Sequence, residues 1–356
     1  MRILMSPPPS KRNSIGILLT RVAHEMRRRG YKITGGLFHY LGFDLSAWQG
    51  VFVFGTPRWL PKLIRDHRAV TITIGRPEIR EEDEALGFPY LVEHEVQEAK
   101  MAEAILGASK VAFISHYVKN VWQEIFAKRG LPFPEEKTAI VHHGVDLTRF
   151  TPDPSQRTEP FVIGMAGQFR RTQGLQAIFE ISRRLQFPHS LVLVGSMTPE
   201  YRRVFDAGMI NPDLSARTTH IPWVPAEELP NYYRQMSCFY HPNIGEPFGI
   251  VVAEALACGV PVVCPRYGGP AEFVLPYGGV AVDTTNWDYG EMFISGMEQA
   301  ILQIHARLEA YSAGARQQAE RLLSIESCVD AYLDLMGLPR AATSIDGIRE
   351  TSCELR

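Results

Sequence analysis

The feature that most constrains the fold of this chain is an alternation of short apolar runs with longer amphipathic stretches. Alternating strand and helix patterns favour a parallel, doubly wound sheet with helices on its faces. In the first half the apolar runs are residues 2–5, 50–54, 69–74 and 110–114, and the helical patterns include 17–29, 96–106 and 118–128.

The same alternation begins again after a polar, proline-rich segment at residues 151–160. The chain has 356 residues, which is longer than one compact core usually grows. We therefore expect an α/β protein of two Rossmann-like domains that face a cleft, without an internal repeat that can be aligned. The expected division is 1–152 for the first domain, 153–160 for a linker, 161–323 for the second domain, 324–340 for a final helix and 341–356 for a tail.

Composition and the first residues indicate where such a protein works. Hydrophobic residues make up 45% of the chain and charged residues 21%, and no apolar run has the length of a membrane span. Pro7, Pro8 and Pro9 leave no room for the apolar core of a secretory signal. The five cysteines are scattered without a C-x-x-C pair, which indicates neither a disulfide framework nor a zinc site. These features predict a cytoplasmic protein.

Positive charge is concentrated near the N-terminus, although the net charge of the chain is only -2. Residues 1–70 hold twelve Lys or Arg against the acids Glu25, Asp44 and Asp66. Two interpretations stay open: a solvated basic face, or peripheral contact with an anionic partner such as the inner face of a membrane or a charged acceptor. No nucleic-acid partner is predicted.

Residues 245–259 have the pattern of a buried helix, with the sequence GEPFGIVVAEALACG. Pro247 suits a first helical turn, Gly259 suits a C-cap, and Glu254 is the single charge of an apolar interior. Burying an ionised carboxylate without partners costs several kcal/mol. Glu254 therefore needs hydrogen-bond donors, and the hydroxyls of a sugar are suitable.

The beginning of this predicted helix is a candidate anion site. Free N–H groups and the helix dipole would attract a phosphate near Phe248, Gly249 and Ile250. Glu246 and Glu254 would flank the phosphate, one holding the donor sugar and the other a ribose. Two structural alternatives stay open: Glu246 caps the helix, and Glu254 pairs with an arginine.

A buried strand at 260–264 and a glycine turn at Gly268 and Gly269 follow, and such a turn can bring backbone N–H groups against a ligand. With these motifs the chain resembles the retaining, family-four glycosyltransferases of the GT-B fold. Other places that agree in the expected order are residues 144–152, similar to the family's domain junction, 114–118, similar to its last N-domain strand-to-helix turn, and 225–233, similar to the helix before its donor site.

The resemblance implies a nucleotide-sugar donor and a role for each matching residue. Glu254 is similar to the family's ribose ligand, and Glu246 to the residue that contacts the transferred sugar. Gly268 and Gly269 would lie close to the donor, and Gly16, in the loop 14–16, resembles the glycine that faces the phosphates. The family's final helix usually crosses back onto the N-terminal domain.

The sequence departs from the family at the phosphate-binding cations. An Arg and, five residues on, a Lys usually follow the first strand of the second domain, whereas this chain has Gln168 and Gln173. Preorganised donors that stabilise growing negative charge are commonly worth about 3 to 4 kcal/mol each. Arg170 and Arg171, in the same loop, are the predicted catalytic replacements.

A second departure concerns a histidine that in the family often follows a central N-domain strand and contacts the donor sugar. Here residues 69–74 are followed by Gly75 and Arg76 instead. His94 and His116 are the nearest candidates, with a structural role as the alternative.

The reaction that the resemblance implies is a retaining hexosyl transfer to a sugar, lipid-linked or other hydroxyl acceptor, with the leaving phosphate accepting the acceptor proton. No cofactor and no metal are predicted, since the chain has no Asp-x-Asp and the acidic run 81–84 is more typical of a solvated face. The alternatives are a degenerate nucleotide-sugar-binding subunit without turnover, and a sugar-nucleotide epimerase or phosphorylase of the same architecture.

Overall fold

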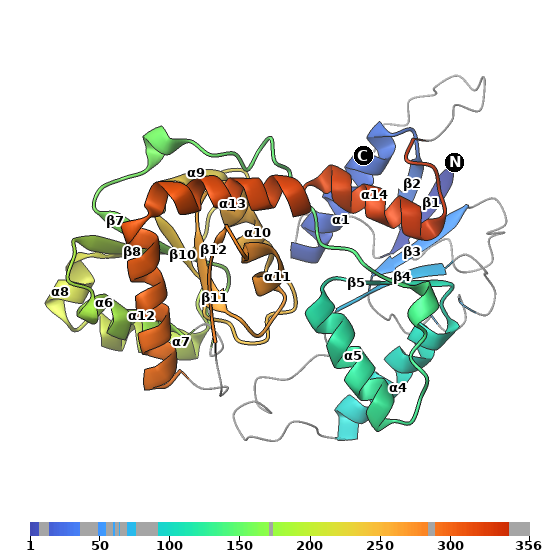
Figure 1. Cartoon of the computed structure of the whole chain (residues 1–356), viewed down its shortest axis with the longest axis horizontal. Helices are drawn as coiled ribbons and strands as arrows, with labels where there is room; N and C mark the ends of the chain where they lie inside the picture. The colour runs from blue at the N-terminus through green and yellow to red at the C-terminus, as the bar shows by residue number, and fades with distance from the viewer. Residues whose placement is uncertain are drawn as a thin grey trace.

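The protein consists of two six-stranded sheets in which every strand pair is parallel, with helices packed around each sheet (Figure 1). This confirms the predicted α/β architecture of two doubly wound units. The structure is a computed structural model and describes residues 1–6, 14–35, 49–54, 60, 64, 70–75, 92–170, 174–283 and 289–341.

The first sheet is formed by the N-terminal half of the chain. Its elements are β1 (Arg2–Ser6), α1 (Ser14–Arg28), β2 (Lys32–Gly35), β3 (Gly50–Phe54), β4 (Val70–Ile74), α4 (Val92–Gly107), β5 (Lys110–Phe113), α5 (His116–Lys128), the 3-10 helix η3 (Glu135–Lys137) and β6 (Thr138–Ile140). The strand order is β2-β1-β3-β4-β5-β6. All five residues of β4 are buried, as expected for a strand covered on both faces.

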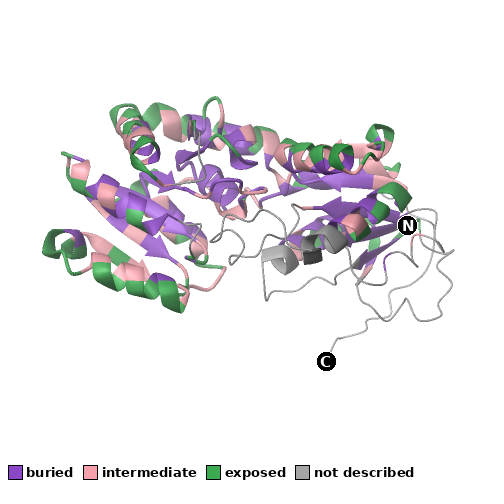
Figure 2. Ribbon diagram, turned by 90° about the horizontal axis from the view of Figure 1, so that it is seen from below, coloured by how far each residue is buried: buried purple, intermediate pink, exposed green. Residues whose placement is uncertain are grey.

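The second sheet follows η4 (Pro154–Gln156). Its elements are β7 (Phe161–Ala166), α6 (Leu175–Arg184), β8 (His189–Val194), α7 (Pro199–Gly208), α8 (Pro212–Ala216), β9 (Thr218–Ile221), α9 (Leu229–Gln235), β10 (Cys238–Tyr240), α10 (Ile250–Ala257), β11 (Val262–Pro265), α11 (Pro270–Val274), β12 (Gly279–Val282), α12 (Glu291–Ala306) and α13 (Leu308–Leu322). The order is β12-β11-β10-β7-β8-β9. Figure 2 shows the strands of both sheets as the buried layer and the outer faces of the helices as the exposed one.

The chain passes between the two sheets twice, and the two connections are hydrogen-bonded to each other. The first follows β6, and the second joins α13 to α14 (Ile325–Met336). Val145 N–H donates to Leu323 O at 2.7 Å, and Ile325 N–H donates to Val145 O at 3.0 Å. A Cβ at Gly144 would lie 2.5 Å from Ile325 Cα, so the close approach requires glycine.

Helix α14 completes the core of the first half, beside α1 (Figure 1). Ser324 caps its first turn by accepting a hydrogen bond from Ser327 N–H at 3.0 Å, and Gly337 ends it with φ +67°. The ring of Tyr332 meets the ring of Phe52 of β3 edge-on at 4.6 Å. The last helix therefore shares the apolar core of the first sheet.

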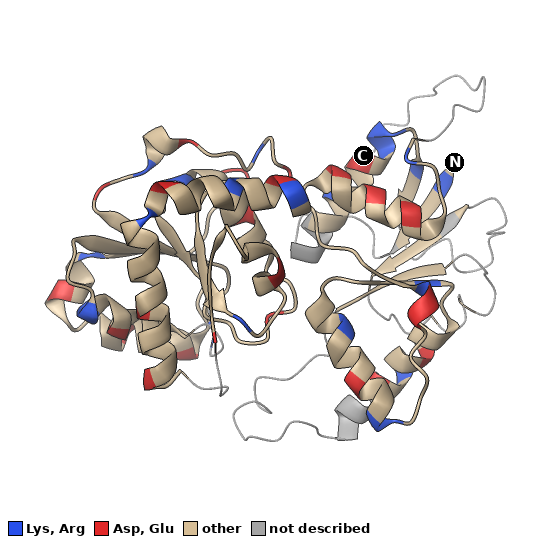
Figure 3. Cartoon of the chain, in the orientation of Figure 1, with Lys and Arg blue, Asp and Glu red and all other residues tan. Residues whose placement is uncertain are grey.

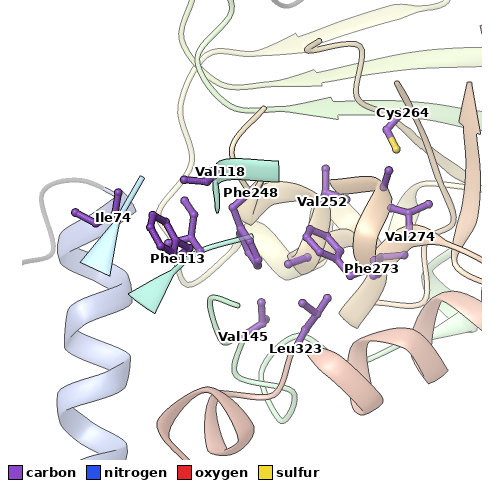
Figure 4. Close-up of a cluster of buried hydrophobic side chains, with 14 of the residues drawn as sticks. Ile74, Phe113, Val118, Val145, Phe248, Val252, Cys264, Phe273, Val274 and Leu323 are labelled. Carbon is purple, nitrogen blue, oxygen red and sulfur yellow. The ribbon is translucent and has the colours of Figure 1, made fainter. Parts of the chain in front are cut away.

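A single apolar cluster also joins the two halves of the molecule (Figure 4). Phe113 and Val118 enter it from the first half, and Phe248 and Phe273 enter it from the second. Val145 contributes from the first connection. Burial of apolar area against both halves favours the arrangement in which they are in contact.

Half of the basic residues near the N-terminus belong to the described part of the chain. These are Arg2, Arg21, Arg27, Arg28, Arg29 and Lys32. Arg28 and Arg29 pair with Glu25, and Arg29 also pairs with Asp330 of α14, on the helix whose acidic residues lie beside α1 in Figure 3. The other six lie outside the described residues, so contact with an anionic partner stays a prediction. Within the described ranges, no helix has the length and apolar character to cross a bilayer.

Candidate active site

The loops after β10 and β11 lie against each other where these parallel strands end. Gly245 N–H donates to Tyr267 O at 2.9 Å, and Gly269 N–H donates to Glu246 O at 2.8 Å. A Cβ at Gly269 would lie 2.2 Å from Pro247 O, so only glycine fits this approach. The N–H of Gly269 is thus used within the protein, and the predicted position of Gly269 close to the donor stays a prediction.

Helix α10 begins at Ile250, four residues after the predicted start at Glu246. Gly249 has φ +80°, a left-handed conformation that ends the loop before the helix. Glu246 Oε1 accepts a hydrogen bond from Gly249 N–H at 3.1 Å, and Glu246 Oε2 accepts one from Asn243 Nδ2 at 2.6 Å. Glu246 thus holds the entrance of the helix, and Pro247 precedes it. Val252 and Ala253 N–H donate to Gly249 O at 2.9 and 3.2 Å, so the N–H groups of Ile250 and Val251, which precede these hydrogen bonds, are the ones that suit an anion.

Phe248 anchors this loop in the core between the two halves (Figure 4). Its side chain is 2% exposed, and its ring lies 4.8 Å from the ring of His143 and 4.9 Å from that of Phe273. Burial lowers the pKa of His143 to about 3, so this imidazole is neutral. Only the backbone of Phe248 is therefore available to a ligand.

Glu254 lies on the second turn of α10 and is 5% exposed. Arg21 of α1 donates to its Oε1 at 3.1 Å, and the hydroxyl of Tyr233 donates to its Oε2 at 3.3 Å. Burial raises the pKa of Glu254 in spite of the opposing effect of Arg21. The sequence left open that Glu246 caps the helix and that Glu254 pairs with an arginine. In the structure Glu246 accepts the N–H of Gly249 just before α10, and Glu254 pairs with Arg21.

Three other residues were predicted to contact the phosphates: Gly16, Arg170 and Arg171. Gly16 lies in the first turn of α1 rather than in a loop, which corrects the prediction of a loop at residues 14–16. Arg170 is exposed in the segment after β7, beside the exposed Gln168. Arg171 and Gln173 lie outside the described residues. The role of Arg170 and Arg171 as phosphate ligands stays a prediction.

A cleft of about 450 Å³ opens between α5 of the first half and the β11–α11 loop of the second. Gly268 lines it, as does His116. The rings of Tyr117 and Tyr267 meet across it edge-on at 5.1 Å between centroids. The predicted donor residue Gly268 thus faces a cavity between the two sheets. His94, the other histidine candidate, lies in α4, and its side chain is outside the described residues.

Sequence reasoning missed Glu272, which joins the two halves at the beginning of α5. Its carboxylate accepts hydrogen bonds from Tyr117 N–H at 2.7 Å and His116 N–H at 2.9 Å, and His142 Nε2 lies 3.2 Å from Oε2. Ser115, the N-cap of α5, donates to Pro247 O at 2.7 Å. Glu272 follows the glycine turn, and Ser115 lies in the segment 114–118, so both belong to motifs that can be seen in the sequence. Their hydrogen-bond partners, however, are 155 and 132 positions away.

The pKa of Glu272 predicts an acid-sensitive contact between the two halves. Burial opposes ionisation, yet the hydrogen bonds from His142 and the two amides outweigh it and lower the pKa. A depressed carboxyl pKa adds stability that is present above the unfolded-state value and is lost as pH falls through the folded value. We expect Glu272→Gln to destabilise the protein by about 2 kcal/mol at neutral pH, because charged hydrogen bonds are lost.

The measurement is the melting temperature of wild type and Glu272→Gln between about pH 7 and pH 3. The difference should shrink as the pH falls, because the wild-type carboxyl is then protonated as well. Glu124→Gln, which changes an exposed carboxyl that also lines the cleft, is the matched control and should show little difference at any pH. A constant difference over the whole range would contradict the assignment of the effect to ionisation.

His241 is a second residue that the sequence did not single out. It directly follows β10, is 3% exposed, and its Nε2 has no hydrogen-bond partner in the part of the chain that the structure describes. Burial lowers its pKa, while the charge of Glu246 acts in the opposite direction. A neutral imidazole with one unpaired nitrogen therefore lies near the carboxylate at the helix entrance.

Two parallel six-stranded sheets with a site at the strand ends define the GT-B class. Comparison with known proteins gives the family: residues 148–303 match the sequence model described as "Glycosyl transferases group 1". This segment of the chain thus matches the group 1 glycosyltransferases, and the likeness to solved structures shows the GT-B fold, in agreement with the resemblance seen in the sequence.

Individual relatives are distant. A D-inositol 3-phosphate glycosyltransferase of Arthrobacter sp. (strain FB24) is 28% identical over 219 residues, which cover 55% of this chain and 51% of that protein. The chain spans about half or less of the length of the curated relatives it matches.

Solved structures agree over nearly the whole chain, at identities that show the fold alone. Sucrose-phosphate synthase from Thermosynechococcus elongatus has a TM-score of 0.72 and 16% identity, covering 94% of this chain and 97% of its own. Anabaena HepE in complex with UDP has a TM-score of 0.67 and 15% identity, covering 95% of this chain and 100% of its own.

Proposed function

We propose that this protein transfers a hexosyl group from a nucleotide-sugar donor to a hydroxyl acceptor, with retention of configuration at the anomeric carbon. The observation that supports it most is the match to the group 1 glycosyltransferases over the segment that contains Glu246 and Glu254. Among structural neighbours, HepE is described in complex with UDP, a nucleotide that such a donor would leave behind.

The proposed reaction needs no nucleophile from the protein. The bond between the anomeric carbon and the phosphate oxygen breaks, the acceptor oxygen bonds to the anomeric carbon on the same face, and its proton passes to the leaving phosphate. The protein then has to place the two substrates and stabilise the charge that grows on the diphosphate.

The N-terminus of α10 supplies groups that can hold the donor. The N–H groups of Ile250 and Val251 at the start of α10 suit a phosphate, while Glu246 beside them is the proposed ligand of the transferred sugar. Glu254 is the proposed ribose ligand. Gly268, in the wall of the cleft, would lie close to the donor.

Three further parts of the proposal rest on the sequence. Arg170 or Arg171 supplies the positive charge that Gln168 and Gln173 lack, since the planar guanidinium can take two phosphate oxygens. The first half, residues 1–152, binds a sugar, lipid-linked or other hydroxyl acceptor. Its basic residues provide peripheral contact with an anionic membrane.

A thermal-shift screen against UDP-, GDP- and ADP-sugars tests the donor assignment. A ligand at 100 times its dissociation constant stabilises a fold by about 2.7 kcal/mol, so the correct nucleotide should raise the melting temperature clearly. Glu254→Gln should abolish most of that rise, because an amide offers one acceptor oxygen in place of the carboxylate. An unchanged rise in Glu254→Gln would contradict the ribose assignment.

The alternatives make different predictions for the purified protein. A degenerate binding subunit would bind the nucleotide sugar without transferring or hydrolysing it. An epimerase would convert the donor with no acceptor present, and a phosphorylase would require inorganic phosphate. Product analysis with and without acceptor and phosphate separates all of them from transfer.

A further inference from the structure

The ion pair between Arg21 and Glu254 links the N-terminal helix α1 to the helix that begins at the candidate donor site. Arg21 Nη2 lies 3.1 Å from Glu254 Oε1, and 13% and 6% of the two side chains are exposed. The guanidinium also lies 5.3 Å from the centroid of the Phe150 ring, in the first connection. Burying two charges is costly, so a pair between residues 233 positions apart calls for an explanation.

Charged and titratable groups face Glu254 from four parts of the molecule. Arg21 approaches from α1, Tyr233 from α9, Arg149 from the first connection and Cys258 from the end of α10. Arg149 acts only through its charge, because its own guanidinium donates to Ala226 O. Burial raises the pKa of the Cys258 thiol to about 12, so it is neutral. Arg21 is thus the cation that contacts the carboxylate directly.

The carboxylate has unused acceptor capacity in this arrangement. An ionised carboxylate offers about four lone-pair sites, two on each oxygen. Arg21 uses one site on Oε1, and the hydroxyl of Tyr233 uses one on Oε2. Among the described residues no other donor is bonded to it, so one site on each oxygen remains, a pattern that matches two neighbouring hydroxyls of a cis-diol.

We propose that Arg21 is a positioning residue for the donor, which keeps the Glu254 carboxylate ionised and oriented so that its remaining lone pairs accept the two hydroxyls of a ribose. This inference rests on the proposed function, in which Glu254 is the ribose ligand. It adds Arg21, a residue of the first half, to nucleotide binding.

The role of Arg21 has a pH signature that a packing role lacks. Burial already raises the pKa of Glu254, and Arg21 is the main group that opposes it. Without the guanidinium the pKa rises further, so the carboxyl is protonated at a higher pH and presents a hydroxyl where a lone pair is needed. Binding is then weak at neutral pH and recovers as the pH rises through the raised pKa.

The test is calorimetric titration of UDP, GDP and ADP into the full chain between about pH 6 and pH 9. Arg21→Gln should bind at least about ten-fold more weakly than wild type at neutral pH and regain most of the loss at the alkaline end. Arg21→Lys keeps the charge and should follow the wild-type profile. Arg28→Gln is the matched control: Arg28 is on the same helix, 63% exposed and paired with Glu25, and its loss should change neither profile.

Three results would overturn the proposal. Binding by Arg21→Gln that equals wild type at every pH would show that the pair does not affect the ribose site. Tighter binding would show that Arg21 competes with the nucleotide. A loss of the same size at every pH, shared by Arg21→Lys, would show a packing role only.

A second measurement separates failure of this inference from failure of the proposed function. Without ligand, Arg21→Gln should lower the melting temperature in the wild-type background and much less in the Glu254→Gln background, because the pair is already broken there. If wild type binds none of UDP, GDP and ADP, the proposed function and the ribose assignment fail together. If wild type binds and the two substitutions lower the melting temperature additively, only the positioning role of Arg21 fails.

Discussion

Glu246→Gln is expected to lower turnover by about 100-fold while nucleotide affinity changes little. The carboxylate is the proposed ligand of the moving sugar, and it already accepts Gly249 N–H and Asn243 Nδ2. Glutamine can keep the hydrogen bond from Gly249, so the loop survives, but it lacks the negative charge. Steady-state kinetics together with nucleotide titration measures the two effects separately.

The control for this prediction is Asn243→Ala, which removes one hydrogen bond to Glu246 and leaves its carboxylate in place. Turnover should then fall by less than about ten-fold. If Asn243→Ala is as damaging as Glu246→Gln, or if Glu246→Gln weakens nucleotide binding as much as turnover, Glu246 serves to shape the loop and not to hold the sugar.

Arg316→Ala is expected to destabilise the protein by about 3 kcal/mol. Arg316, on α13, donates through Nη1 to Ala257 O at 2.8 Å and Phe150 O at 2.9 Å, and to Leu147 O at 3.4 Å. One guanidinium thus holds the end of α10 against the first connection between the sheets. Alanine leaves these half-buried carbonyls without their charged donor, and loss of a group that satisfies several acceptors is among the costly kinds of substitution.

Thermal unfolding measures this effect, with Arg321→Ala as the comparison. Arg321 is an exposed arginine of the same helix, and its loss should shift the melting temperature only slightly. Equal shifts for the two variants would show that the contacts of Arg316 with the connection contribute nothing beyond an ordinary surface arginine.

Much of the fold could be predicted from local patterns, because apolar runs between helical stretches are specified by neighbouring residues. Val70–Ile74 is a strand close to the predicted position, and every residue in it is buried. The burial of Glu254 also followed from its apolar neighbours. The family resemblance added the GT-B arrangement, which periodicity alone does not contain.

The details that could not be predicted depend on contacts between distant segments. Pro247 favours a helical first turn, but a positive φ at Gly249 and its hydrogen bond to Glu246 move the start of α10 to Ile250. Glu272 caps a helix 155 positions away. No local sequence pattern predicts such a hydrogen bond, because the two residues meet only after both sheets have formed.

The position of α14 affects the order in which the two halves of the protein can fold during synthesis. Tyr332 and Leu333 fill the core beside β1 and β3, yet they are translated after the whole second sheet. The N-terminal half therefore leaves the ribosome before α14, which covers part of its apolar core, has been made. The second half, although made later, can close its sheet first. Domains usually fold in the order in which they are made, whereas here the core of the first half is completed only by the last helix.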